Sequence, residues 1–240
     1  MENTTRPEGK GLSGRTAALM TGLALLTMLL IAPPAYYHFL PMGGSTRDIE
    51  SLLPTLRQVG RGYVVGLFLL FGVYILDLII AWGVYWFFRP DQHALGQLAA
   101  WTRLVYTALA MVALGLNFQA YDLANSQQLA GSLTEGELSS AVALSLSNAA
   151  SFMRVAWIFF GVHLFVLALT IIRSRLVPFW VGIPVLLAAL AYLLPISARY
   201  YAPDLDLGLL SSATPGELAF MVWLLAAGWR SATHNRLRND

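Results

Sequence analysis

Six polar or ionisable side chains lie within long apolar stretches of this chain or at their ends. They are Asp77, Arg103, Asn117, Arg154, His163 and Glu217. A charge at the centre of a bilayer costs at least about 2.5 to 3.5 kcal/mol on insertion scales, so each buried charge needs a compensating partner. Such residues either form ion and proton pathways or fix how helices pack. We treat all six as candidates for a polar interior.

Asp77 and Arg103 are the two charges expected deepest in the membrane. Asp77 lies about eleven residues from the end of its apolar stretch, and Arg103 lies about eight residues into the next one. At about 1.5 Å per residue, their depths differ by only roughly 4 to 5 Å, which an arginine side chain can bridge. We therefore predict an ion pair. It could act as a proton or ion relay, or it could fix helix register.

Asn117 follows Arg103 by fourteen residues on the same predicted helix. At roughly 100° per residue the two side chains lie within about 40° of each other, with Tyr106 near the same face. A polar seam along this helix is therefore possible.

His163 is expected near the bilayer midplane, where a histidine can titrate or bind a metal. A hydrogen bond that packs helices together is the alternative, and we favour it. Haem would need a second histidine at matched depth, but His38, His93 and His234 lie at a span end or in polar segments. Arg154 is nine residues earlier and roughly 180° around the helix, so His163 should face another neighbour.

Arg154 lies near the end of its apolar stretch, where two acidic partners are conceivable. These are Asp122 and Glu217. The alternative is that the arginine extends into the lipid headgroups, which we favour because interfacial charge costs little.

The composition requires a membrane setting for these residues. Hydrophobic residues make up 57% of the 240 residues and charged ones only 12%, with a mean hydropathy of +0.62. Soluble domains carry about twice that charge fraction, and apolar runs of this length are bilayer spans. We predict an all-α polytopic transmembrane bundle of about six spans. The expected spans are residues 17–39, 63–88, 95–121, 150–172, 177–197 and 214–229.

The connections differ in character. Residues 40–61 mix charges with leucines as in a short interfacial helix, whereas residues 122–149 form a polar connection without lysine or arginine. In that connection Thr134 and Glu137 have capping-box spacing. The short link after residue 172 predicts an antiparallel helical hairpin.

The two ends of the membrane region are less regular. Pro33 and Pro34 should kink or end the first span, for which a secretory signal is the rival interpretation and a retained helix the favoured one. The last span has capping spacing at 214–217, but its roughly sixteen residues reach only about 24 Å. Thinning of the bilayer or an earlier start near Leu209 would compensate.

Arginine and lysine counts predict the orientation. One set of connections and tails holds ten basic residues and the other holds five. Because basic residues are retained on the cytoplasmic side, we expect both tails, residues 1–16 and 230–240, in the cytoplasm. The expected location is the inner (plasma) membrane.

A family resemblance rests mainly on the second half of the chain, in IFFGVHLFVLALTIIRSRLVPFWVGIPVLLAALAYLL and GELAFMVWLLAAGW. The matching positions are Gly161, His163, Ser174, Pro178, Gly182, Tyr192, Glu217, Trp223, Leu224 and Gly228, with Arg103 to Val105 earlier. In these the chain resembles the bacterial multi-pass membrane proteins known as domain of unknown function 4386. Ala168-Leu169 stands where that family often has glycine. The resemblance implies six helices and supplies no substrate.

Enzyme signatures are thin. The chain has no cysteine, P-loop, HExxH or GxSxG motif, and no basic run typical of nucleic-acid binding. We therefore expect no catalytic residues, metal, cofactor or nucleic-acid partner, and the lipid bilayer as the one evident partner. The leading hypothesis is transport or sensing of a small solute or proton. The alternative is a structural or partner-binding membrane protein, and a membrane enzyme ranks behind both.

Overall fold

The computed structural model describes residues 12–36, 49–202, 204–205 and 207–236, and within them all regular structure is helical. The α-helices are α1 (Gly14–Pro34), α2 (Ile49–Val59), α3 (Arg61–Phe88), α4 (His93–Asn125), α5 (Gln127–Ala130), α6 (Glu135–Arg173), α7 (Gly182–Tyr201), α8 (Gly208–Ser211) and α9 (Glu217–Arg236). Two 3-10 turns, η2 (Phe179–Val181) and η3 (Thr214–Gly216), precede α7 and α9.

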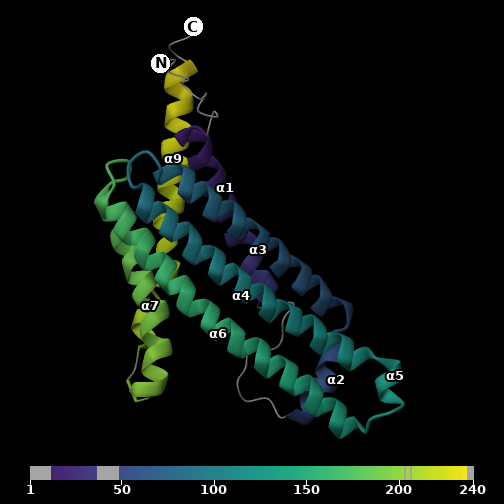
Figure 1. The fold of residues 1–240 in the computed structure, drawn as a ribbon. Helices are drawn as coiled ribbons and strands as arrows, with labels where there is room; N and C mark the ends of the chain where they lie inside the picture. Colours follow the sequence, from purple (N-terminus) through teal and green to yellow (C-terminus); the bar gives the residue numbers. More distant parts are fainter. Residues whose placement is uncertain (1–11, 37–48, 203, 206, 237–240) are drawn as a thin grey trace, which may run out of the picture.

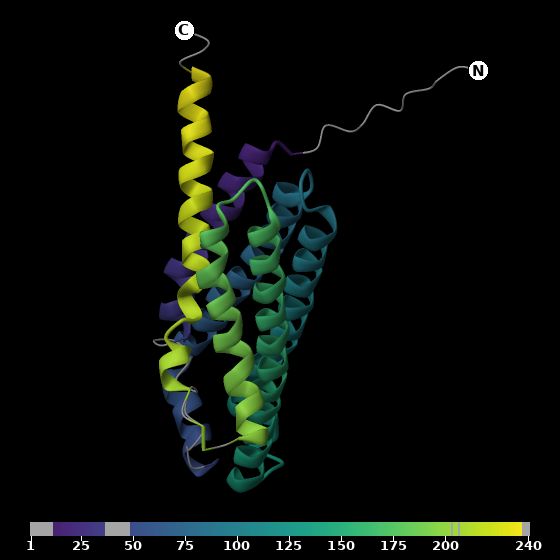
Figure 2. The same cartoon turned by 90° about the vertical axis from the view of Figure 1, so that its left-hand side faces the viewer.

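Six long helices form a closed bundle (Figure 1). Each packs against the next in the order α1, α3, α4, α6, α7 and α9, and α9 returns to pack against α1. The view from the side shows that α9 begins partway up the bundle and extends beyond its upper end (Figure 2). The predicted all-α bundle is therefore confirmed.

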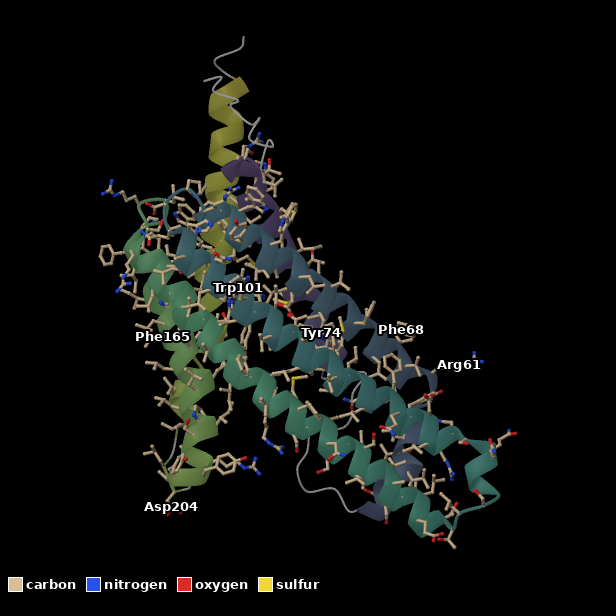
Figure 3. All side chains as sticks on the ribbon, in the orientation of Figure 1. Arg61, Phe68, Tyr74, Trp101, Phe165 and Asp204 are labelled. Atoms are coloured by element: carbon tan, nitrogen blue, oxygen red, sulfur yellow. The ribbon has the colours of Figure 1, made fainter. Side chains whose placement is uncertain are left out.

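Large apolar side chains cover the outside of this bundle. Phe68 is 62% exposed and Trp101 58% exposed, and Figure 3 labels both on the ribbon. A soluble monomer rarely exposes so much apolar surface. In the described residues five helices, α1, α3, α4, α6 and α7 with η2, are long and apolar enough to cross a membrane. The chain is therefore a membrane-embedded helical protein. The helix α9 contains most of residues 214–229, the predicted sixth span, and its crossing of the membrane stays a prediction.

The α3–α4 turn and the α6–α7 link lie together at one end of the bundle. Gln92 Nε2 donates to the carbonyl of Arg173 at 3.1 Å, and the N–H of Arg175 donates to Asp91 at 2.8 Å. Hydrogen bonds from the Ser174 side chain and this N–H hold the pKa of Asp91 below its usual range. We call this end, residues 88–93 and 173–178, the turn end. The link is short, as expected for a helical hairpin, and α7 packs along α6.

Residues 122–149, predicted as a polar connection, are helical for most of their length. The helix α4 continues to Asn125, and α6 already begins at Glu135. Leu138 and Val142 are buried against the other helices, and this packing extends α6 beyond its apolar stretch. At about 1.5 Å per residue, its 39 residues span about 58 Å, well beyond a hydrocarbon core of about 30 Å.

The predicted capping box at the start of α6 is confirmed. The Thr134 hydroxyl accepts from the N–H of Glu137 at 3.3 Å, and the Glu137 carboxylate accepts from the N–H of Thr134 at 2.8 Å. Bonds from the Thr134 side chain and backbone hold the pKa of Glu137 below its usual value. Two orphan donors of the helix end are thereby satisfied.

The short helix expected between the first two spans is present as α2. Its Leu53 and Leu56 are buried, and Arg57 Nε donates to the carbonyl of Ala124 at the end of α4 at 2.9 Å. The first helix ends at Pro34, and residues 37–39 of the expected first span lie outside the described residues. The interfacial position of α2 stays a prediction.

Close approach of α1 and α3 depends on Gly83. A Cβ at this position would overlap Thr21 Oγ1, and Met20 Cε lies 3.3 Å away. Thr21 is fully buried and its hydroxyl donates to the carbonyl of Ala17 at 2.7 Å, so rotating it away would break that bond. The glycine therefore sets the distance between the two helices.

Gly83→Ala should lower the free energy of unfolding by about 1 to 3 kcal/mol, because overpacking forces the helices apart. Gly72→Ala is the matched control on the same helix, since its Cβ would meet nothing within 4 Å. That substitution should raise stability slightly through helix propensity. Thermal unfolding of the purified protein in detergent measures both, and equal melting temperatures for the two variants would contradict the packing argument.

A buried charge cluster as candidate functional site

Four ionisable side chains from four helices meet inside the bundle. Arg103 on α4 is the centre, and its Nε donates to Asp77 Oδ1 on α3 at 2.8 Å. Its Nη1 donates to Glu217 Oε1 on α9 at 2.6 Å and lies 3.1 Å from His163 Nε2 on α6. Asp77, Arg103 and His163 are 0% exposed, and the Glu217 side chain is 12% exposed. We call these four residues the charge cluster.

The hydrogen bonds of His163 identify its tautomer. Its Nδ1 lies 2.8 Å from the carbonyl oxygen of Ala99, which can only accept, so Nδ1 carries the proton. Arg103 Nη1 can only donate, so the facing Nε2 accepts. Both bonds are made at once only by a neutral imidazole.

The cluster therefore has unequal numbers of positive and negative groups. One guanidinium faces two carboxyl groups, and the neutral His163 adds no charge. With both carboxyl groups ionised the net charge is −1 in an apolar interior. Buried charge of this kind is costly unless it is compensated.

Two atoms of the cluster lack a hydrogen-bond partner within the described residues. They are Asp77 Oδ2 and Arg103 Nη2. Arg103 Nη2 lies 2.7 Å from Asp77 Oδ1 and so takes part in the ion pair. The geometry of this contact is not that of a hydrogen bond. Asp77 Oδ2 is thus a buried acceptor that makes no hydrogen bond to the described residues.

The residues of the cluster lie at one level of the bundle. Each of three members lies ten or eleven residues from the end of its helix at the turn end: Asp77 in α3, Arg103 in α4 and His163 in α6. At about 1.5 Å per residue this is about 15 to 16 Å, about half of a hydrocarbon core. The ion pair between Asp77 and Arg103 expected from their depths is present.

Glu217 reaches the cluster because α9 begins inside the bundle. The turn η3 packs closely on α7, where a Cβ on Gly216 would overlap the carbonyl of Pro184. Although Thr214 and Glu217 have capping spacing, no side chain caps η3, and the carboxylate turns to Arg103 instead. An acidic side chain in the first helical turn also interacts favourably with the helix dipole.

Asn117 and Arg154 lie outside the cluster. Tyr63 donates to Asn117 Oδ1 at 2.9 Å, and buried apolar residues of α4, Ala110 and Ala113, separate this bond from Arg103. The polar seam considered possible along this helix is therefore interrupted. Arg154 Nη2 donates to Ser151 at 2.7 Å. In the described part of the chain, neither Asp122 nor Glu217 forms an ion pair with Arg154, because Glu217 binds Arg103.

Sequence reasoning missed a tyrosine pair next to the cluster. The hydroxyls of Tyr36 and Tyr74 lie 3.1 Å apart. The signal available was the spacing of three residues between Tyr74 and Asp77, which places both on one helix face. Among the residues that the structure describes, no group of three or more His, Asp or Glu side chains is arranged to hold a metal ion.

The fold and the cluster define a class: a membrane-embedded helical bundle with a charged interior. The chain belongs to the family "Domain of unknown function (DUF4386)", whose model matches residues 20–228. It is 26% identical over 178 residues to an uncharacterized protein of Archaeoglobus fulgidus, covering 74% of this chain and 88% of that protein. No solved structure matches. The resemblance seen in the sequence is confirmed, and a bacterial origin stays a prediction.

Proposed function

We propose that this protein binds a proton at the charge cluster and uses that binding to transport or sense a small solute or the proton itself. The supporting observation is the charge count: two carboxyl groups share one guanidinium at the middle of an apolar bundle. A single positive charge would make the cluster neutral. We further propose the inner (plasma) membrane, with both termini in the cytoplasm, as its location.

A proton suits this site better than a larger cation or solute. The atoms around Asp77 are packed, since Asp77 and Arg103 are both 0% exposed. Arg103 occupies the position between the two carboxylates that a metal ion would need. Proton uptake needs no additional volume, and intramembrane carboxyl groups are frequent members of proton relays.

Infrared difference spectroscopy tests this proposal on the purified protein in lipid. Lowering the pH from about 8 to about 5, the range in which proton switches work, should produce the C=O stretch of a protonated carboxyl group in an apolar environment. Asp77→Asn should remove this band, because the cluster is then neutral without a proton. Absence of the band in the unmodified protein would refute proton binding at the cluster.

A structural or partner-binding role is the second candidate, and one observation favours it. The bonds of Arg103 and His163 tie together α3, α4, α6 and α9, and buried pairs can serve to fix one arrangement of helices. Under this alternative, Asp77→Asn lowers the melting temperature, and the infrared spectrum of the unmodified protein is insensitive to pH in the carboxyl region.

A further inference from the structure

Two tyrosine hydroxyls lie beside the charge cluster without belonging to it. Tyr36 follows the end of α1, Tyr74 lies in α3, and their hydroxyl oxygens are 3.1 Å apart. Tyr74 is 1% exposed, whereas Tyr36 is partly exposed. The pair therefore joins the surface of the bundle to its interior with groups that both donate and accept hydrogen bonds.

Tyr74 lies on the same face of α3 as Asp77. It precedes Asp77 by three residues on α3, a spacing that brings Cβ atoms to about 5 to 6 Å on one helix face. Asp77 Oδ2, which has no hydrogen-bond partner in the described residues, is an acceptor on this face of the helix.

The opposite direction along α3 offers no polar group. From Asp77 toward the turn end, the same face of the helix carries Ile80, Val84 and Phe88, which are 0%, 1% and 0% exposed. These belong to an apolar core that also includes Phe220 of α9. On this face of α3, a proton therefore has a tyrosine on one side of Asp77 and apolar side chains on the turn-end side.

We propose that Tyr36 and Tyr74 form a proton relay between the surface of the bundle and Asp77. This inference rests on the proposed function. It adds the route by which the proton reaches Asp77 and the side of the charge cluster from which it arrives. In the inward step Tyr74 gives its hydroxyl proton to Asp77 Oδ2 and takes the proton of Tyr36, which takes one from a hydronium ion at the surface and leaves water. Each oxygen that loses a proton gains one, so the two tyrosines end unchanged.

The other charged and titratable groups around Asp77 are consistent with this direction. Arg103 and Tyr106 face it from α4, and Glu217 interacts with it from α9. His163 of α6 contacts Arg103 on the side of Glu217, and its Nδ1 proton is bonded to a backbone carbonyl. Of these groups only Arg103 is bonded to Asp77, through Oδ1, so Oδ2 remains available to the relay.

The rate of proton uptake after a rapid pH drop tests the relay. We would follow it by stopped-flow infrared or a pH indicator on the full-length protein in lipid. Tyr74→Phe and Tyr36→Phe each remove one oxygen atom and should slow uptake by about a hundredfold, the lower end of what a positioned proton-transfer group contributes. The final extent of uptake should not change.

Tyr63→Phe is the matched control. Tyr63 is a buried tyrosine of the same helix whose hydroxyl bonds Asn117, fourteen residues from Asp77. This variant should take up protons at the unmodified rate. Unchanged rates in Tyr36→Phe and Tyr74→Phe, with normal uptake in the unmodified protein, would overturn the relay alone. Loss of uptake in the unmodified protein would overturn the proposed function as well.

Discussion

Arg103→Met should be the most destabilising single substitution in the charge cluster. It leaves Asp77 and Glu217 buried with no cation, and His163 loses the donor to its Nε2. Removing one partner of a buried ion pair costs about 3 to 5 kcal/mol because the remaining charge is uncompensated. We expect a loss of this size in the free energy of unfolding, measured by denaturant titration in detergent micelles at neutral pH.

A triple variant separates charge from packing. In Arg103→Met with Asp77→Leu and Glu217→Met, all charges are removed and the volumes are roughly kept. Replacing a buried ion network with apolar residues is often neutral or stabilising, so most of the lost stability should return. If the triple variant is as unstable as Arg103→Met alone, the loss comes from the shape of the arginine and not from unpaired charge.

Glu217→Gln should abolish proton uptake by the charge cluster with little loss of stability. Glutamine keeps an oxygen that can accept from Arg103, and it removes one negative charge, so Arg103 and Asp77 balance. Potentiometric uptake between about pH 8 and pH 5 should be smaller by about one proton per chain than in the unmodified protein. Because Arg103 retains Asp77, the cost in stability should be smaller than that of Arg103→Met.

Two further variants test whether the Glu217 charge is the cause of this change in proton uptake. Glu217→Leu removes the acceptor as well as the charge, so the first turn of α9 should also exchange its amide hydrogens faster. Glu135→Gln is the control, since Glu135 pairs with Arg57 at the surface with its side chain 88% exposed. It should leave proton uptake in that range unchanged. Normal uptake in Glu217→Gln would show that the charge imbalance is not the source of the proton site.

The part of the site that follows from helix geometry could be predicted from the sequence. The similar depths of Asp77 and Arg103 on neighbouring helices predicted their ion pair. The angle between His163 and Arg154 around their helix predicted that the two contact different neighbours. Both arguments need only the rise and the turn per residue. They apply where a helix crosses the membrane without interruption.

Glu217 could not be placed in this way. Its spacing from Thr214 offers a complete local explanation for an acidic residue, namely a helix cap at the membrane surface. The structure instead starts α9 at the depth of Arg103, and a bond between residues 114 positions apart replaces the cap. Long-range contacts of this kind leave no periodic pattern in the sequence. For the same reason, the packing of residues 135–149 on α2 and α4 could not be predicted from hydropathy.

The starting depth of α9 also has a mechanical consequence. From Glu217 the helix runs about 16 Å to Gly228, whose carbonyl accepts from Arg15 of α1, and then continues beyond the other helices to Arg236 (Figure 2). A helix of this length resists compression, so an axial displacement at its outer end is transmitted to its inner end. Any displacement of α9 along its axis would therefore change the distance of 2.6 Å between Glu217 Oε1 and Arg103 Nη1.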